Sequence, residues 1–342
     1  MSDNRSGIWR RVEELVDRAP GTAALRAHRL HLVAVRSWRA RGRHVPAGLR
    51  ADEHSAAIMA LAVPLLLARA RAAYSGSLML MKGPEAAAHR EDPATRYFRD
   101  LDLLVDDPPA AQRALVARGF IEGGNPDDYE DAQHLRPLAW PGVPLVVELH
   151  RRPNCPQWLM PPPSQELFRG AVPSRTGVEG VLAPSPAVHA LLLAAHSWAH
   201  RPLARLADLI DIVAVLDADG RTVADDLARQ WGWSGMWRTT IAAADAVLAD
   251  RSCPLSLRIW ARHLRPARES TVLETHLLRI AAPVWAMPLT HAPRAAGVAF
   301  SQVAAKGSKE SWGDKRRRSG KAVAHAFMPE SAHIRTLQRS DE

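Results

Sequence analysis

The feature that most limits the fold of this chain is a change in the spacing of its apolar residues. Through most of the first 75 residues, apolar side chains recur three and four positions apart, in segments 8–16, 23–40 and 53–73. This spacing is the period of an amphipathic helix. We therefore expect the N-terminal part of the chain to be helical. Pro64 should kink the third segment, because proline removes a helical hydrogen bond.

After residue 75 the pattern changes to short apolar runs that end at turn-forming residues. Residues 77–82 and 101–105 are the clearest of these runs, and their length is typical of buried strands. A further pair of runs over residues 134–150 is divided by Pro141-Gly142, which indicates a hairpin. The middle of the chain is therefore predicted to form a small sheet.

Helical spacing returns near residue 186 and continues to about residue 304, with a break near Pro266. The basic run Lys315-Arg-Arg-Arg318 follows without a clear period, which indicates a mobile tail. The predicted fold class is α+β, a small mixed β-sheet flanked by N-terminal and C-terminal helical blocks. The expected parts are an N-terminal helical segment, a sheet-containing core, a C-terminal helical domain and a basic, disordered tail, at residues 1–75, 76–160, 161–304 and 305–342.

The charge of the chain bears on its partners. The formal net charge is +9 and the isoelectric point is near 10.3, values that would suit a nucleic-acid-binding protein. Basic residues are spread over the whole length, however, and the chain has only 3 tyrosines and 5 phenylalanines on which bases could stack. A solvated basic surface is the better interpretation, and nucleic acid is the less favoured partner.

Features of export or membrane insertion are not apparent in the sequence. The first residues lack the apolar stretch of a secretory signal, and the longest uncharged apolar run, residues 58–68, is about half of a membrane span. The two cysteines, Cys155 and Cys253, lie far apart and form no disulfide framework. We therefore expect a cytoplasmic protein without a membrane partner.

Two aspartates begin the second apolar run, in Asp100-Leu101-Asp102. Positions i and i+2 of a strand share one face, so both carboxylates point to one side while Leu101 points into the core. Burying two like charges a few ångströms apart is costly unless a cation neutralises them. The pattern indicates a site for Mg²⁺, which prefers oxygen ligands. The alternative is an exposed strand end without a function.

Other polar residues accompany the two aspartates. Lys82-Gly83 ends the first apolar run, and a glycine turn with a nearby cation can hold phosphate oxygens. Glu148 and His150 share one face of the run over residues 145–150, so both could border the same site. The alternative for Glu148 is a charge at a strand end in solvent.

Along the chain the order is Lys82-Gly83, then Arg96, then Asp100 and Asp102, and later Glu148 and His150. This order resembles the uncharacterised bacterial nucleotidyltransferase family of the polymerase-β superfamily. The segment from His196 to His200 and the segment Arg205-Leu-Ala-Asp-Leu-Ile-Asp211 are similar to the helical segment of that family. The resemblance extends over residues 50–290. One departure concerns the Gly-Ser turn of the superfamily, which is Gly83-Pro84 in this chain.

The resemblance implies a two-metal enzyme that moves a nucleoside monophosphate from a nucleoside triphosphate, such as ATP, to a hydroxyl-bearing acceptor and releases pyrophosphate. Its cofactor would be Mg²⁺ or Mn²⁺. The implied catalytic and metal-binding residues are Asp100, Asp102 and Glu148. The implied nucleotide-binding residues are Lys82, Gly83, Arg96 and His150. The sequence does not identify the acceptor, for which a small molecule or a peptide is favoured over nucleic acid.

Two other functions stay open at this point. Because no serine follows Gly83, the chain could be a degenerate relative that binds a nucleotide or a partner protein without turnover. A basic nucleic-acid-binding protein would instead use residues 305–342. The pair His196 and His200 favours packing or lining of the site over zinc binding, since no glutamate follows His196 as a zinc-protease motif requires.

Overall fold

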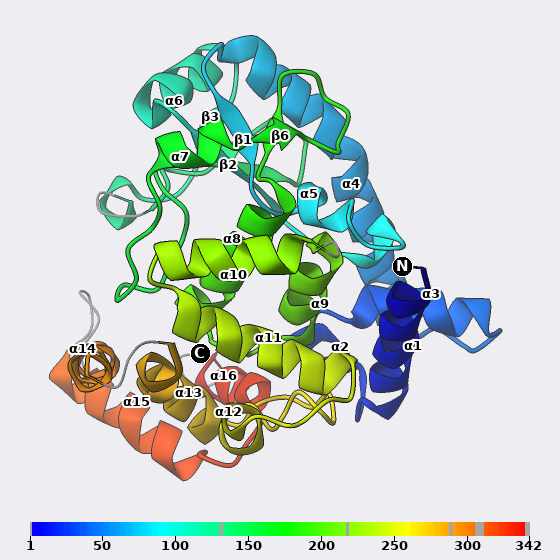
Figure 1. Ribbon diagram of the computed structural model, residues 1–342, viewed down its shortest axis with the longest axis vertical. Helices are drawn as coiled ribbons and strands as arrows, with labels where there is room; N and C mark the ends of the chain where they lie inside the picture. Colours follow the sequence, from blue (N-terminus) through cyan, green and yellow to red (C-terminus); the bar gives the residue numbers. More distant parts are fainter. Residues whose placement is uncertain (1, 130–132, 217–218, 287–289, 305–310, 339–342) are drawn as a thin grey trace.

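The computed structural model describes residues 2–129, 133–216, 219–286, 290–304 and 311–338. One mixed sheet lies in the upper half of the molecule, and a helical half lies below it (Figure 1). Helices flank the sheet, so the predicted α+β fold class is confirmed.

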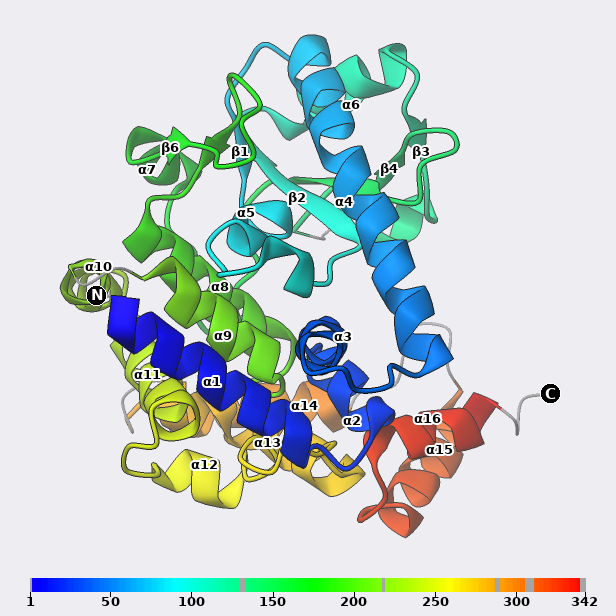
Figure 2. The ribbon, with the colours of Figure 1, turned by 90° about the vertical axis from the view of Figure 1, so that its right-hand side faces the viewer.

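Four helices form the N-terminal block: α1 (Ser2–Arg18), α2 (Thr22–Ala27), α3 (His31–Ala40) and α4 (Ala47–Ala73). The first three pack with the lower, helical half of the molecule, where Leu15, Leu25 and Val33 are buried in one core with side chains of later helices. Helix α4 then carries the chain up to the sheet (Figure 2). It continues through Pro64 to its end at Ala73.

Seven short strands form the sheet in the order β3-β4-β5-β2-β1-β7-β6. Their bounds are β1 (Leu78–Leu80), β2 (Asp100–Val105), β3 (Ile121–Glu122), β4 (Leu138–Ala139), β5 (Val146–His150), β6 (Val172–Pro173) and β7 (Leu182–Ala183). Strands β4 and β5 pair antiparallel across the turn at Pro141-Gly142, as the hairpin pattern predicts. The long strands β2 and β5 pair parallel at the centre.

The period of two in β2 and β5 sends different residues to the two faces of the sheet. Leu101 and Leu103 are fully buried in a core with Leu66 of α4 and Leu115 of α6 (Pro108–Ala117). The even-numbered residues of the same strands point to the opposite face, where Leu104 joins the core of the helical half. Since the register pairs Asp102 with Glu148, these two carboxylates lie side by side on that opposite face.

The remaining helices complete the lower half and the links to it. They are α5 (Pro84–Ala87), α7 (Ser164–Arg169), α8 (Pro186–His200), α9 (Leu206–Val215), α10 (Gly220–Gln230), α11 (Ser234–Leu248), α12 (Leu255–Ile259), α13 (Val272–Ala286), α14 (Ala292–Ala304), α15 (Trp312–Ala324) and α16 (Glu330–Gln338), with short 3₁₀ turns at Pro93–Thr95 and Pro126–Asp128. Helix α8 lies between the sheet and the other helices of this half (Figures 1 and 2).

Two parts of the C-terminal half differ from the expectations. The break near Pro266 is wider than expected, because helix α12 ends at Ile259 and α13 begins only at Val272. The expected disordered tail contains two helices, α15 and α16, within the described residues 311–338. A capping box starts α15, in which the Ser311 side chain accepts the Asp314 N–H and Asp314 accepts the Ser311 N–H. Residues 305–310 and 339–342 lie outside the described part.

Helix α4 has one further property. Among the described helices it alone has the length and apolar composition that could cross a membrane, and a third of its most apolar window is buried. Leu66 and Leu67 are fully buried against the sheet, whereas Leu61 is 82% exposed on the other side of the helix. The helix thus covers the sheet with one side of a largely apolar surface.

Candidate active site

A cavity of about 510 Å³ lies between the sheet and the helical half. Side chains from β2, β5, α8, α9 and the turns beside them line it. All seven residues that the sequence singles out line this one cavity: Lys82, Gly83, Arg96, Asp100, Asp102, Glu148 and His150. The structure therefore brings together residues that are up to 68 positions apart in the sequence.

Asp102 is the most deeply buried carboxylate of the sheet face, with 2% of its surface exposed. Its Oδ1 atom lies 2.7 Å from Lys82 Nζ and 2.9 Å from His150 Nε2. Burial alone would raise the pKa of Asp102, but the Lys82 ammonium and the His150 hydrogen bond outweigh burial and hold that pKa well below its usual range. Asp102 is thus ionised and already neutralised by neighbouring groups.

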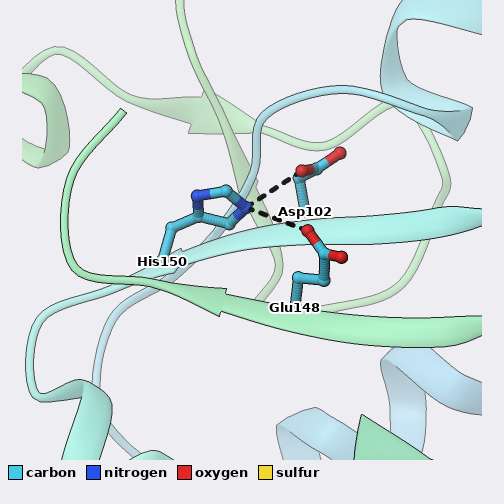
Figure 3. A group of neighbouring side chains, drawn as sticks. All are labelled: Asp102, Glu148 and His150. Carbon is cyan, nitrogen blue, oxygen red and sulfur yellow. Dashed lines mark hydrogen bonds and ion pairs between the residues drawn. The ribbon is translucent and has the colours of Figure 1, made fainter. Parts of the chain in front are cut away.

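Glu148 and His150 lie on β5 beside Asp102 of β2, and one nitrogen of the imidazole faces both carboxylates (Figure 3). His150 Nε2 lies 3.8 Å from Glu148 Oε2, and ligand atoms of Asp102, Glu148 and His150 all lie within 4.8 Å of one another. Burial, and next the charge of Asp102, raise the pKa of Glu148. Two carboxylates and one imidazole at this spacing could hold a divalent cation.

His150 is 1% exposed, and burial lowers its pKa, so the ring is neutral near pH 7. A neutral ring has one N–H, and its Nε2–H donates to the Asp102 carboxylate. Its Nδ1 atom is buried without a hydrogen-bond partner among the described residues. This tautomer makes His150 a group that orients Asp102.

Asp100 lies on the same sheet face, two residues before Asp102. It does not belong to the three-residue ligand group, which contains Asp102, Glu148 and His150 in the described part of the chain. Burial and the Asp102 charge both raise the pKa of Asp100. The two aspartates of the motif therefore have opposite environments, although they share one strand face.

Lys82 and Gly83 follow β1 at the edge of the cavity. Lys82 Nζ also lies 3.1 Å from Nδ1 of His196, whose pKa is lowered well below the usual range, first by burial and then by the Lys82 charge. Gly83 has a φ of 59°, and a Cβ atom there would lie 3.1 Å from the Asp100 carbonyl oxygen. Only glycine fits this left-handed turn without strain, so Gly83 allows the chain to pass close to β2.

Arg96 is bound to a carboxylate that the sequence does not single out as part of the site. Its Nε atom donates to Asp211 Oδ2 on α9 at 2.8 Å, and Arg90 contacts Oδ1 of the same carboxylate at 2.7 Å. Burial would raise the pKa of Asp211, but the two guanidinium groups outweigh burial and lower that pKa. The sequence signals for Asp211 were its charge within the apolar helix α9 and its place in the segment that is similar to the helical segment of the family, and neither indicates Arg96 as its partner.

Histidines of α8 complete the wall opposite the sheet. His196 and His200 lie one turn apart with ring centroids 4.6 Å from each other, and His200 Nε2 is 3.1 Å from the Asn154 side-chain amide. Their position four residues apart on α8 places both in the cavity lining, as the sequence favours. Within the described residues, Lys82 contacts His196 and Asn154 contacts His200.

Comparison with known families matches residues 20–249 to a family described as uncharacterised nucleotidyltransferase. Comparisons with curated proteins and with solved structures give no match. The matched segment includes all of the sheet, helices α8 and α9, and all seven of the residues that the sequence singles out.

Proposed function

Because the chain belongs to the uncharacterised nucleotidyltransferase family, we propose that it transfers a nucleoside monophosphate from a nucleoside triphosphate to a hydroxyl-bearing acceptor and releases pyrophosphate. The observation that carries this proposal is the group Asp102, Glu148 and His150 in a cavity that also contains Lys82 and Arg96. A nucleoside triphosphate with bound cations needs two kinds of group: carboxylates that bind the cations, and basic side chains that bind the phosphates.

Asp100, Asp102 and Glu148 are the proposed ligands of Mg²⁺ or Mn²⁺. Their carboxylate oxygens are the donors that these hard cations prefer, and those of Asp102 and Glu148 are already within reach of one ion. Asp100 is proposed as a ligand because it lines the same cavity on the strand face of Asp102, where a bound cation would favour its ionised form. When bound, the ions would stabilise charge on the attacking and leaving oxygens.

Lys82, which is paired with Asp102 in the structure, is proposed to bind phosphate when a nucleotide is present. Its ammonium contacts Asp102 Oδ1 at the place where a divalent cation would bind. Two cations repel each other at that distance, so Lys82 would turn to the triphosphate once Asp102 binds an ion. Arg96, which Asp211 holds at the cavity wall, would contact the same phosphates.

Glu148 and His150 would have different roles in the reaction, Glu148 at the acceptor and His150 at Asp102. As an alternative to holding the second ion, Glu148 would take the hydroxyl proton of the acceptor, since its raised pKa makes it a better proton acceptor than an exposed glutamate. His150 donates its Nε2–H to Asp102 and would keep that carboxylate in a fixed orientation.

The test is pyrophosphate release by the full chain with each nucleoside triphosphate, with Mg²⁺ or Mn²⁺, in the presence of a cell extract as the acceptor source. Glu148→Gln should lower the rate by roughly a hundredfold, as removal of a general base does. Glu122→Gln is the matched control, since Glu122 lies on β3 of the same sheet and pairs with Arg136 outside the cavity. Labelled triphosphates would show which molecule accepts the nucleotide. Equal rates in both variants would contradict the proposal.

A nucleotide-binding relative without turnover is the second candidate, and one observation favours it. Pro84 stands where the superfamily turn has serine, so the first turn of α5 offers neither a hydroxyl nor an N–H at this position. This candidate predicts that a triphosphate binds with Mg²⁺ while no pyrophosphate appears with any acceptor. Calorimetry and the pyrophosphate assay together separate the two functions.

A further inference from the structure

Two turns of the helical half meet beside the cavity, although they are far apart in the sequence. One contains His28 and Arg29 between α2 and α3, and the other contains Arg205 before α9. The Ala207 N–H donates to the His28 carbonyl oxygen at 3.2 Å, and the Leu206 N–H lies 3.4 Å from His28 Nδ1. The two turns are thus joined by hydrogen bonds.

Two buried histidines hold these turns from behind. His28 Nε2 donates to the Arg268 carbonyl oxygen at 2.7 Å, and His263 Nε2 donates to the Ala204 carbonyl oxygen at 3.1 Å. Their rings stack with centroids 5.8 Å apart, and both side chains are almost fully buried. The backbone positions of Arg29 and Arg205 are therefore fixed by the fold.

Both turns also contain a residue with a strained backbone. Arg29 has a φ of 54° and Leu203 has a φ of 50°, in the left-handed region that favours glycine. Such residues persist only where the surrounding structure fixes them, and they gather at binding sites. Arg29, with this backbone conformation, lines the cavity.

Arg29 and Arg205 both line the cavity and are half-buried. No hydrogen bond or ion pair joins either side chain to another described residue, whereas Lys82 and Arg96 are paired with Asp102 and Asp211. Both side chains line the same cavity from turns that hydrogen bonds join, and in agreement with this, burial and next the charge of Arg205 lower the pKa of Arg29. The charges of Asp208 and Asp100 act on Arg29, but neither carboxylate forms an ion pair with it within the described residues, so the N–H groups of both arginines can bind a multivalent anion.

We propose that Arg29 and Arg205, which we call the arginine pair, bind the β- and γ-phosphates of the nucleoside triphosphate. This inference rests on the proposed function and adds a phosphate-binding element from the N-terminal helical segment. The arginine pair lines the same cavity as the proposed metal ligands, and the charge of Arg29 acts on Asp100. The departing pyrophosphate gains charge in the reaction, and guanidinium forks match its oxygens.

The test measures binding of inorganic tripolyphosphate and of ATP with Mg²⁺ to the full chain by calorimetry. Arg29→Ala and Arg205→Ala should each weaken tripolyphosphate binding at least tenfold, the size expected for a charge-assisted hydrogen bond. Arg113→Ala is the matched control, because Arg113 is exposed on α6 outside the cavity and its loss removes the same net charge. This control should bind as the wild type does.

Arg29→Gly separates binding from folding. Glycine adopts the left-handed conformation without strain, so this variant should keep or raise the melting temperature while its tripolyphosphate affinity falls as in Arg29→Ala. A lower melting temperature with unchanged affinity would show that Arg29 is structural and would overturn the inference.

The outcomes for the wild type separate the two proposals. If the wild type, Arg29→Ala and Arg205→Ala all bind tripolyphosphate equally well, the inferred role of the arginine pair is wrong, whereas the proposed function is not contradicted. An equal loss in Arg113→Ala would also overturn the inference, because the effect would then be one of net charge. If the wild type binds neither tripolyphosphate nor ATP with Mg²⁺, the proposed function fails together with the inference.

Discussion

Asp102 and Asp211 are both buried, both line the same cavity, and both carry a pKa below the usual range, yet different cations neutralise them. Asp102, on the sheet wall, contacts Lys82 and the neutral ring of His150. Asp211, on the helical wall, is bound by two guanidinium groups.

The difference lies in which of these contacts can be exchanged. Arginine stays charged at any ordinary pH, and the two forks on Asp211 occupy both oxygens of its carboxylate. A lysine side chain is flexible and carries a compact charge, so Lys82 can leave Asp102 when another cation arrives. We infer that Asp211 holds the wall of the cavity in place, whereas Asp102 is available for chemistry.

Asp102→Asn should have the largest effect on activity. The variant keeps the shape of the side chain but loses the charge that would hold a cation, so pyrophosphate release should fall by roughly a thousandfold or more. It should also be less stable than the wild type, because Lys82 is left half-enclosed without its counterion. Turnover within tenfold of the wild type would remove the distinction between the two aspartates.

Asp211→Asn should have the largest effect on folding. Removing one partner of a buried ion pair leaves Arg90 and Arg96 without full compensation, and such changes cost about 3–5 kcal/mol of unfolding free energy. Urea unfolding would measure the loss. Asp208→Asn is the matched control on the same helix, since Asp208 is only half-buried and accepts one hydrogen bond from Ser197. Equal stability of the two variants would contradict a structural role for Asp211.

Acidification should lower the free energy of unfolding, because His28 is buried in its neutral form. Burial lowers the pKa of His28 to about 4, whereas the same group in the unfolded chain titrates near 6.5. Between these values His28 of the unfolded chain binds more protons, so His28 alone should lower the free energy of unfolding by about 3 kcal/mol as pH drops from 6.5 to 4, in addition to the contributions of buried His31, His189 and His263. Unfolding curves at several pH values would measure this slope. His28→Gln should show a smaller slope, and an unchanged slope would exclude His28 as its origin.

Asp100→Asn should have the smallest effect on stability, and in the opposite direction to Asp102→Asn. Because the pKa of Asp100 is raised, its charge destabilises the folded chain at neutral pH, and a neutral amide should leave the stability equal or up to about 1 kcal/mol higher. Melting temperatures of the two variants would decide. A loss of stability in Asp100→Asn equal to that of Asp102→Asn would show that the aspartates have similar environments.

The sheet side of the cavity could be predicted from the sequence because its patterns are local. A period of two places Asp100 and Asp102 on one face, and the same rule applies to Glu148 and His150 on the neighbouring strand. The opposite pKa directions of the two aspartates could not be predicted, since they depend on Lys82 and His150, which form ion pairs with Asp102 and none with Asp100 in the described part of the chain.

On the helical side, the sequence favours a lining position for His196 and His200, but the other contacts could not be predicted, because they join distant residues without a repeating pattern. Arg96 and Asp211 are 115 positions apart, and no spacing rule links a loop arginine to an aspartate on a later helix. Arg29 lies in the segment 23–40 that the sequence predicts as helical, whereas the structure ends α2 at Ala27, gives Arg29 a left-handed backbone and begins α3 at His31. The neighbouring His28 contacts residues far along the chain, which no local pattern indicates.

The hydrogen bond between His28 and the Arg268 carbonyl oxygen spans 240 residues and has a consequence for synthesis on the ribosome. At about 5–20 residues per second, the turn with Arg29 would leave the ribosome roughly 10–50 s before the segment that fixes it. During that interval α1–α3 lack the later helices with which they form their core. Until the later helices are synthesised, α1–α3 expose their apolar side chains. We therefore expect chaperone binding or aggregation at this early stage of synthesis.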